Sequence, residues 1–377
     1  MEALDLFEDI VVDAPSTEGI KYAGSKQKLL PHILSLARKV NPRTVLDAFA
    51  GTTRVSQAFA QSGYTVVAND IAAWSAVFAS CYLLNQHTKA HYEPMIAHLN
   101  GLAPLDGWFT EQYGGDPGDG SSIGPDGLKK PWQRKNTRRL DAIRAEIDRL
   151  QISPVERSVL LTSLIRALDE VDSTLGHYAS YLNEWSPRSY KQLVLKVPSL
   201  LSKTAPHSVH QGDIFDLIPS VQVDLAYLDP PYGSNNEKMP PSRVRYSAYY
   251  HVWTSVVLND QPPTFGKARR RSDTSDTLSA SIFEEFRRNA AGQLIAVEAI
   301  RSALASVRAK YVLLSYSSGG RATAEELNRV IRETGRLLEV VEVDYHRNVM
   351  AGMRWTNEWV RDAEAPNREF LFLVEKA

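Results

Sequence analysis

The chain has 377 residues, of which 43% are hydrophobic and 23% are charged. This composition is typical of a globular protein, and no run approaches the ~20 apolar residues needed to span a bilayer. One cysteine, Cys81, excludes an internal disulfide and a cysteine-rich metal site, so we expect no bound metal and a cytoplasmic location. The formal net charge of −1 excludes an overall basic footprint for nucleic acid, although basic residues cluster locally.

The first part of the chain predicts an α/β unit. Residues 1–19 are acidic and lack the basic flank and apolar core of a secretory signal, so we expect a flexible leader. A buried strand is predicted over 44–50, then a helix that ends at Gly63, a strand over 64–70 and a helix over about 72–84. This order is typical of a parallel sheet whose strands are covered on both faces.

The middle of the chain, 87–205, shows no convincing strand alternation and predicts a mostly helical insertion. Leu140, Ile143, Ile147 and Leu150 follow helical spacing. Ser153-Pro154, with a glutamate three residues after the serine, is typical of a helix start. The insertion therefore divides a catalytic domain into two parts, 20–86 and 206–377.

Strand character returns after the insertion. Strands are predicted over 208–218 and 223–229, followed by a loop-rich segment over about 233–280. A helix near 292–308, a strand over 310–318 and a helix near 322–335 come next, and the last two strands cover 337–347 and 368–374. We therefore predict one α/β sheet interrupted by a helical block.

Three of the predicted strands end on acids, which are Asp47, Asp70 and Asp229. In open α/β sheets, ligands bind beyond the carboxyl ends of the strands. The dinucleotide motif G-x-G-x-x-G is missing, and the first turn has one glycine, Gly51, which does not build a pyrophosphate cradle. An acid after the second strand suits two ribose hydroxyls, so the pattern favours a nucleoside without phosphates, such as S-adenosylmethionine.

The stretch "DLAYLDPPYG" places Asp229-Pro230-Pro231-Tyr232 directly after a strand. The Asp229 carboxylate and the Pro230 carbonyl are neighbouring acceptors that can hold both hydrogens of an exocyclic amino group. The two prolines stiffen the turn, so the acceptors are positioned in advance. Tyr232 can stack on a planar base drawn out of a duplex, and the motif therefore predicts an aromatic amine as the nucleophile.

These motifs resemble the amino-methyltransferases of DNA, and most closely the DNA adenine methylase family in its alpha motif order. The resemblance implies an α/β fold, a Rossmann-like S-adenosylmethionine-dependent methyltransferase sheet with a mostly helical inserted target-recognition domain. It also implies cofactor contacts from "KYAGSKQKLL", from "DAFAGT", from the acid of the second strand and from "QGDIFD". The expected cofactor residues are Tyr22, Gly24, Lys26, Asp47, Phe49, Gly51, Asp70, Ile71, Asp213 and Ile214.

The family's activity, carried over to this chain, is methyl transfer to the N6 amino group of adenine in flipped-out bases of duplex DNA, without a covalent enzyme intermediate. Asp229, Pro230, Pro231 and Tyr232 would be the catalytic residues of a bacterial or phage-type enzyme acting at the nucleoid. Duplex DNA is the expected partner, and the sequence leaves open whether a cognate restriction endonuclease accompanies it. The basic stretch of the insertion and the segment after the catalytic motif supply the expected DNA contacts, which are Lys130, Arg134, Lys135, Arg138, Arg243, Arg245, Arg269 and Arg270.

Three alternatives stay open on the residues alone. The same acceptors could serve the N4 amino group of cytosine, or a base in RNA. A non-catalytic DNA-binding protein could retain the fold. Methylation of a cytosine ring carbon is disfavoured because it requires a cysteine nucleophile, and Cys81 lies in a predicted helix far from the catalytic motif, where a small core residue is expected.

Overall fold

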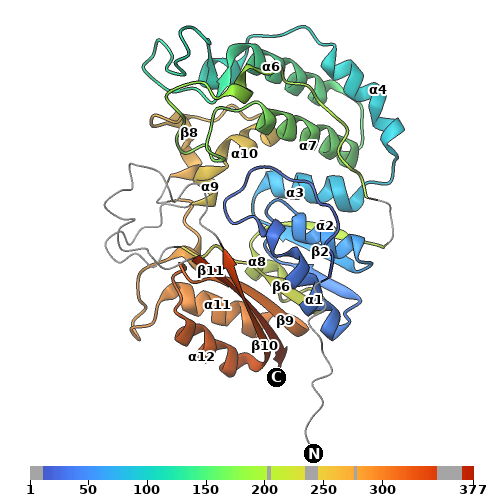
Figure 1. Cartoon of the computed structure of the whole chain (residues 1–377), viewed down its shortest axis with the longest axis vertical. Helices are drawn as coiled ribbons and strands as arrows, with labels where there is room; N and C mark the ends of the chain where they lie inside the picture. Colours follow the sequence, from blue (N-terminus) through green and yellow to red (C-terminus); the bar gives the residue numbers. More distant parts are fainter. Residues whose placement is uncertain (1–11, 202–204, 234–244, 276–277, 346–366) are drawn as a thin grey trace, which may run out of the picture.

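The computed structural model describes residues 12–201, 205–233, 245–275, 278–345 and 367–377. Its described residues form a seven-stranded sheet of order β10-β11-β9-β6-β1-β2-β5, which occupies the lower half of Figure 1. The strands of this sheet are β1 (Thr44–Asp47), β2 (Thr65–Asp70), β5 (Ser208–Gln211), β6 (Gln222–Leu228), β9 (Arg308–Ser317), β10 (Gly335–Tyr345) and β11 (Asn367–Lys376). The predicted α/β class is confirmed, and the sheet is mixed and mostly parallel.

Strand direction places the ends of the strands at one edge. The strands β5, β2, β1, β6 and β9 are parallel to their neighbours, whereas β11 is antiparallel to both β9 and β10. The carboxyl ends of the five parallel strands therefore share an edge, and the beginning of β11 lies at that same edge. Ligands of open α/β sheets bind at this position.

Both faces of the sheet are covered by helices, because alternate residues of each strand point to opposite faces. Val45 and Leu225 pack with α1 and α2, whereas Leu46 and Ala226, their neighbours in the chain, pack with α11 and α12. The helices of these layers are α1 (Leu30–Val40), α2 (Arg54–Gln61), α8 (Ile214–Leu217), α11 (Ile295–Ser306) and α12 (Ala324–Thr334). The alternation explains why β1 and β6 carry hydrophobic residues at successive positions, such as Val45 and Leu46 or Leu225 and Ala226.

A helical block lies above the sheet in Figure 1. Its α-helices are α4 (Lys89–Asn100), α5 (Trp108–Tyr113), α6 (Arg134–Arg149), α7 (Pro154–Glu170), α9 (Tyr246–Tyr249) and α10 (His251–Leu258). The shorter elements near it are η3 (Pro187–Tyr190), η4 (Ser272–Thr274), and the strand pairs β3 (Gly114–Gly115) with β4 (Trp132–Gln133) and β7 (Thr264–Phe265) with β8 (Arg270–Arg271). Within the described ranges, no helix combines the length and apolar character that crossing a membrane requires.

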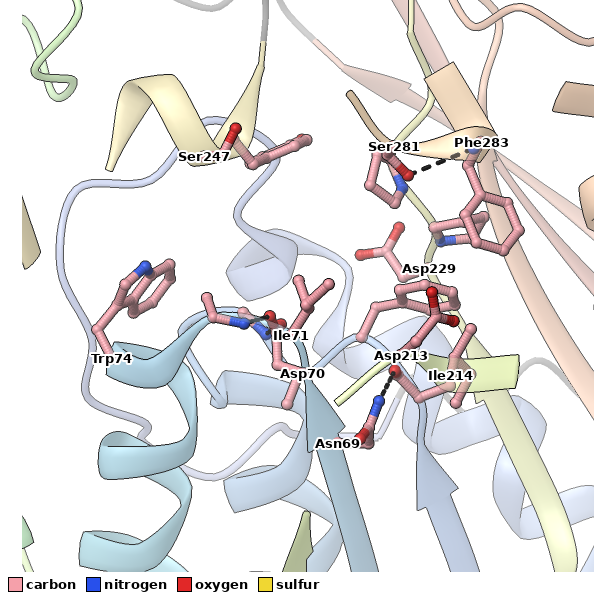
Figure 2. Close-up of a pocket in the computed structure, with 18 of the residues that line it drawn as sticks. Asn69, Asp70, Ile71, Trp74, Asp213, Ile214, Asp229, Ser247, Ser281 and Phe283 are labelled. Atoms are coloured by element: carbon pink, nitrogen blue, oxygen red, sulfur yellow. Dashed lines mark hydrogen bonds between the residues drawn. The ribbon is translucent and has the colours of Figure 1, made fainter. Parts of the chain in front are cut away.

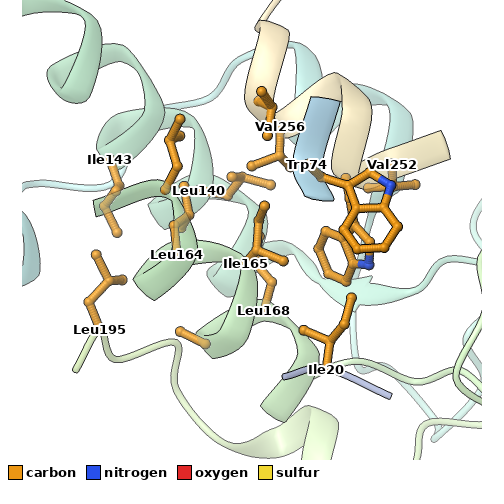
Figure 3. Close-up of a cluster of buried hydrophobic side chains, with 14 of the residues drawn as sticks. Ile20, Trp74, Leu140, Ile143, Leu164, Ile165, Leu168, Leu195, Val252 and Val256 are labelled. Carbon is orange, nitrogen blue, oxygen red and sulfur yellow. The ribbon is translucent and has the colours of Figure 1, made fainter. Parts of the chain in front are cut away.

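The block has its own hydrophobic core, which Figure 3 shows. Leu140 and Ile143 of α6 are buried there as the helical spacing predicts, and Ile165 comes from α7. Val252 of α10 and Trp74 of α3 (Ala73–Ala79) belong to the same cluster. The core therefore joins the insertion to a segment that follows the catalytic motif and to a helix of the sheet domain.

Several predicted elements are confirmed in their local detail. The start of α7 carries a complete capping box, in which the Ser153 hydroxyl accepts from the Glu156 N–H and the Glu156 carboxylate accepts from the Ser153 N–H. The helix predicted over 72–84 is α3 followed by a π-helical turn, η2 (Ser80–Leu84). Cys81 in this turn is fully buried, and burial raises the pKa of its thiol to about 12, as expected for a core residue.

Two predictions of secondary structure are wrong. The strand predicted over 208–218 ends at Gln211, because Asp213 caps α8 by accepting the N–H of Phe215 at 2.9 Å. The segment predicted as loop-rich contains α9 and α10. These helices are stabilised because their apolar side chains pack on the block.

The leader prediction covers residues inside and outside the described ranges. Residues 1–11 lie outside them. Within 12–19, Glu18 accepts hydrogen bonds from Arg166 of α7 at 2.6 Å and from the Ser199 N–H at 2.8 Å, so this part of the leader packs on the helical block. The short η1 (Lys26–Lys28) follows and leads into α1.

Candidate active site

A cavity of about 780 Å³ lies at the carboxyl edge of the sheet, between the sheet and the helical block. It is lined by strand-end residues of β2 and β6, by the turn after β1, by the segment before η1 and by residues of α9 and η5 (Ile282–Glu284). Figure 2 shows Asp229 near its centre, with Asp70 and Ile71 on one side and Phe283 on the other. The cavity therefore brings together the strand ends that the sequence analysis singled out.

Asp70 at the end of β2 is held by backbone donors. One carboxylate oxygen accepts the N–H of Gly51 and the other accepts the N–H of Ala72, each at 2.8 Å. Burial raises the pKa of Asp70, while these donors oppose the rise. Gly51 itself has a φ of 47°, which glycine adopts without strain, so the turn brings its N–H to the carboxylate. Each oxygen keeps a lone pair for a ligand hydroxyl.

The cavity beside Asp70 is apolar and aromatic. Ile71 is 71% exposed although it is a large hydrophobic residue, and Ile214 lies across the cavity from it. Phe49 packs edge-on against Phe283 with ring centroids 5.3 Å apart. Phe283 also stacks on Phe215, with the two rings nearly parallel. These side chains form a slot for a flat ring, with the exposed Asp213 at its rim.

Tyr22 belongs to a stack of aromatic rings at the border with the helical block. Its ring lies 4.6 Å from that of Tyr250 and 5.3 Å from that of Tyr246, and both pairs are stacked. Gly24 follows with a φ of 80°, and a Cβ there would come within 2.9 Å of the Tyr246 hydroxyl. Glycine is therefore required by both the backbone and the space at this position.

Asp47 lies behind the cavity instead of lining it. Its side chain is 1% exposed, and one oxygen accepts the Ser56 hydroxyl at 2.5 Å, while Oδ1 has no hydrogen-bond partner. Burial is the main cause that raises the pKa of Asp47 to about 7. The sequence-predicted acid thus bonds the end of β1 to α2, while residues 48–51 of the turn that follows it line the cavity.

The catalytic motif turns away from the end of β6 into a network of charged and polar side chains. Asp229, Pro230 and Pro231 line the cavity. Asp229 Oδ1 lies 3.2 Å from the Nζ of Lys26, whose side chain is 6% exposed. Burial raises the pKa of Asp229, and the ammonium of Lys26 opposes the rise. Lys26, predicted as a cofactor contact, is therefore also the ion-pair partner of the motif's acid.

Tyr232 is not among the residues that line the cavity in the described part of the chain. Its hydroxyl donates to Asp229 Oδ1 and lies 3.1 Å from the Ser315 hydroxyl. Its ring packs against Tyr316 with centroids 4.8 Å apart, and Lys26 lies over its face. The ring predicted to stack on a base is thus held against the sheet in this structure.

Sequence reasoning missed several residues around the cavity. Tyr246 and Ser247 of α9, Phe283 and Glu284 of η5, and the buried Arg271 of β8 line it, although they come from the segment expected to be loop-rich and its continuation. Burial raises the pKa of Glu284 to about 7. The aromatic run "SAYYHVW" was a signal for Tyr246, but no local pattern indicated Glu284.

The expected DNA-contacting residues of the insertion differ in exposure. Lys130 is buried, with its Nζ 2.8 Å from Asp126 Oδ2, and is not at the surface. Arg134 and Arg138 in the first turns of α6 are 44% and 40% exposed and pair with exposed aspartates. Lys135 beside them is exposed. The start of α6 is therefore the exposed basic part of this stretch.

The remaining four arginines follow the catalytic motif. Arg243 lies outside the described residues. Arg245 is half-buried directly before α9. Arg269 is 38% exposed beside Asp126 of the insertion, and Arg270 lies over the ring of a phenylalanine in the β7–β8 pair. These two arginines connect the rim of the cavity to the insertion.

One histidine group in the described residues could suggest a metal site. His87, His91 and Glu156 bring their ligand atoms within 4.8 Å of one another. However, the two imidazoles are stacked, with centroids 3.9 Å apart and planes 15° apart. Imidazole lone pairs lie in the ring plane, so two parallel rings cannot both point at one ion, and this arrangement is a stacked pair bonded to a glutamate.

Comparison with known proteins agrees with this geometry. The modification methylase StsI of Streptococcus sanguinis is 25% identical over 350 residues, which cover 87% of this chain and 48% of that protein. The modification methylase LlaI of Lactococcus lactis subsp. lactis is 29% identical over 266 residues, 67% of this chain and 40% of that protein. The type II methyltransferase M.NlaIII of Neisseria lactamica is 25% identical over 342 residues, 87% of this chain and 92% of that protein.

The chain thus spans about half the length of the first of these relatives and nearly the whole of M.NlaIII. The family model of the D12 class N6 adenine-specific DNA methyltransferases matches residues 22–276, which include the segment before η1, the insertion and the catalytic motif. The chain therefore belongs to the family of D12 class N6 adenine-specific DNA methyltransferases.

Proposed function

We propose that this chain transfers a methyl group from S-adenosylmethionine to the N6 amino group of adenine in duplex DNA. The observation that carries the proposal is that Asp229 and Pro230 line the same cavity as Asp70 and Ile71. An acceptor pair for an amino group thus shares one space with an acid and an apolar slot suited to a nucleoside. The family and the names of its relatives support the same reaction.

The residues of the cavity fit S-adenosylmethionine. The exposed Ile71 would lie against its adenine ring, and Ile214 and Phe283, which are mostly buried but line the same cavity, would enclose the ring with it. Asp70 has lone pairs for two ribose hydroxyls. The turn with Gly51 would hold the methionine part. When bound, this molecule supplies an electrophilic methyl group on a sulfonium.

The chain's own residues act on the nucleophile. The Asp229 carboxylate and the Pro230 carbonyl would accept hydrogen bonds from the two N–H groups of the adenine amino group and hold its nitrogen in one orientation. No covalent enzyme intermediate is needed, because the amino nitrogen is itself the attacking atom. For stacking on the base, the Tyr232 ring would leave its present contact with Tyr316, or another aromatic of the cavity such as Tyr246 would stack instead.

The helical block would bind the DNA around the target base. The exposed basic residues Arg134, Lys135 and Arg138 at the start of α6 suit phosphate contacts. Arg269, which lies beside Asp126 of the insertion, and Arg270, which precedes the cavity-lining Arg271 in the chain, would extend this surface. This assigns target recognition to the insertion together with the segment after the catalytic motif. The relatives' names as modification and type II enzymes support a role beside a restriction endonuclease.

The test is to incubate the purified chain with duplex DNA and labelled S-adenosylmethionine, and then to analyse the nucleosides by mass spectrometry. We expect N6-methyladenine in the wild type and a loss of kcat on the order of a hundredfold or more in Asp229→Ala. Calorimetry should still detect cofactor binding by this variant, because Asp70 and Ile71 are unchanged.

The control is Asp216→Ala, which removes an exposed acid on α8 outside the cavity and should leave kcat unchanged. Detection of N4-methylcytosine would show that the target base is wrong. Methylation of RNA in preference to duplex DNA would refute the assigned polymer. Near wild-type methylation by Asp229→Ala would refute the role of the acid.

A further inference from the structure

Glu369 is a carboxylate that neither the motifs nor the cavity lining pointed to. It is the third residue of β11 and pairs in register with Ser317 at the end of β9. Since β11 runs antiparallel to β9, its first residues lie at the edge where the parallel strands end. Glu369 is therefore more than a hundred residues from Asp229 in the chain but beside it in the fold.

Glu369 shares two partners with Asp229. The Nζ of Lys26 lies 3.2 Å from Asp229 Oδ1 and 3.6 Å from Glu369 Oε2. The Tyr232 hydroxyl donates to Asp229 Oδ1 and lies 3.2 Å from Glu369 Oε2. The side chain of Glu369 is 12% exposed, so these contacts form in an enclosed place where charge interactions are strong.

This arrangement occupies one of the two carboxylate oxygens, Oδ1, that Asp229 offers to the proposed reaction. Asp229 Oδ1 is engaged by both an ammonium and a phenol hydroxyl, while the incoming amino group also needs acceptor lone pairs from this carboxylate. Glu369 is a second acceptor for the same two donors. A shift of Lys26 and Tyr232 toward Glu369 would release Asp229 without leaving either donor unpaired in the enclosed site.

We propose that Glu369 is a positioning residue of the methyl transfer, which holds Lys26 and Tyr232 so that Asp229 can accept the target amino group. This inference rests on the proposed function. It assigns no contact between Glu369 and the base or the cofactor, because Glu369 does not line the cavity. Its effect passes through the two shared donors.

The groups that face Asp229 set the expected pH dependence. They are Lys26 of η1, Asp47 of β1, Glu369 of β11 and the phenols of Tyr22, Tyr227, Tyr232 and Tyr246. The charge of Asp229 raises the pKa of Glu369, and by reciprocity an ionised Glu369 disfavours the charge of Asp229. Removing the charge of Glu369 should therefore lower the pKa of Asp229, and it also removes one of the two carboxylates that lie within 4 Å of the Lys26 Nζ.

The experiment measures the pH profile of kcat for Glu369→Gln with duplex DNA and S-adenosylmethionine. We expect kcat on the plateau to fall about tenfold or more, because Lys26 stays on Asp229, while the acid limb moves to lower pH. The dissociation constant for S-adenosylmethionine should stay within about twofold of the wild type. Glu369→Asp, which keeps the charge, should recover part of the lost kcat.

Glu375→Gln is the matched control, since Glu375 lies on the same strand and pairs with Arg336 on the surface at 2.6 Å. It should keep the wild-type kcat and pH profile. Wild-type kcat in Glu369→Gln would overturn the inference, and so would a lower kcat with an unmoved acid limb and a lower Tm, which would indicate a structural role. A wild-type enzyme that makes no N6-methyladenine would instead refute the proposed function.

Discussion

At the scale of single residues, two strand-end acids have different roles because their surroundings differ. Asp229 is paired with Lys26 and lines the cavity, so its charge is supported where a substrate can reach it. Asp47 is fully enclosed, accepts the Ser56 hydroxyl and has no partner for Oδ1 in the described residues. An identical side chain thus faces the cavity at one strand end and bonds to a neighbouring helix inside the fold at the other.

The raised pKa of Asp47 predicts a pH-dependent cost to stability. The folded protein keeps a proton on Asp47 up to about pH 7, whereas the unfolded chain loses it near about pH 4. The folded state therefore binds more protons between these values, and the free energy of unfolding falls as the pH rises. Asp47→Asn should raise the free energy of unfolding by about 2 to 3 kcal/mol more at pH 8 than at pH 5, as measured by urea denaturation without cofactor.

Asp224→Asn should change the free energy of unfolding at pH 8 in the opposite direction. Asp224 accepts the backbone N–H groups of Thr44 and Arg43, and these hydrogen bonds lower its pKa. Its stabilising contribution is therefore present above the pKa of the unfolded chain and is lost as the pH falls. This variant should be less stable than the wild type at pH 8, and an equal loss for Asp47→Asn would contradict the assigned burial cost.

At the scale of elements, the start of α6 concentrates the exposed basic residues of the insertion. Arg134 and Arg138 pair with aspartates that are themselves about two-thirds exposed, and such pairs contribute little to stability. Their charges are thus available for a polyanion at low cost to the fold. The core-facing residues of the same helix, Leu140 and Ile143, are buried, so the helix is anchored independently of its basic end.

This separation predicts a defect in DNA binding without a defect in folding. Replacing Arg134, Lys135 and Arg138 by glutamine should weaken binding to duplex DNA and reduce the slope of log K against log salt by about 1 for each phosphate contact that is lost. Fluorescence anisotropy at several salt concentrations measures this slope. Arg149→Gln, at the other end of α6 and 79% exposed, is the control, and an equal change of slope in both variants would refute a localised interface.

At the scale of the whole molecule, the cavity joins parts of the chain that are far apart. It takes Tyr22 and Gly24 from the start, Asp70 and Asp229 from the two halves of the sheet, and Glu284 from η5, between β6 and β9. A ligand that bridges these parts binds the folded chain and not the unfolded one. Its binding must therefore raise the stability of the whole molecule.

S-adenosylmethionine at a hundred times its dissociation constant should stabilise the wild type by about 2.7 kcal/mol and raise the Tm by several degrees. Differential scanning fluorimetry measures the shift. Asp70→Ala should lose most of it at the same ligand concentration, because the ribose acceptors are removed. A shift as large as that of the wild type would contradict the assignment of Asp70 to the ligand.

Local chemistry by itself determined the order of the sheet's first strands, the acids at their ends and the catalytic turn. Alternation, turn residues and caps are properties of short segments, which is why Asp47, Asp70 and Asp229 and the capping box of Ser153 could be located from the sequence. The residue types at those ends favoured a nucleoside cofactor and an aromatic amine as the target, and the family resemblance added adenine.

Only the tertiary structure decided which distant groups meet at this edge. The direction of β11 in the sheet depends on its pairing with β9. The residue pattern of a strand does not indicate whether it pairs parallel or antiparallel, so Glu369 could not be placed beside Asp229 from the sequence. The helices α9 and α10 form because their apolar faces pack on the insertion. The free energy gained by this tertiary packing cannot be read from local helix propensity. Tyr232 turns inward because its hydroxyl forms hydrogen bonds with Ser315 and Glu369. The neighbouring strands β9 and β11 bring these two residues to it.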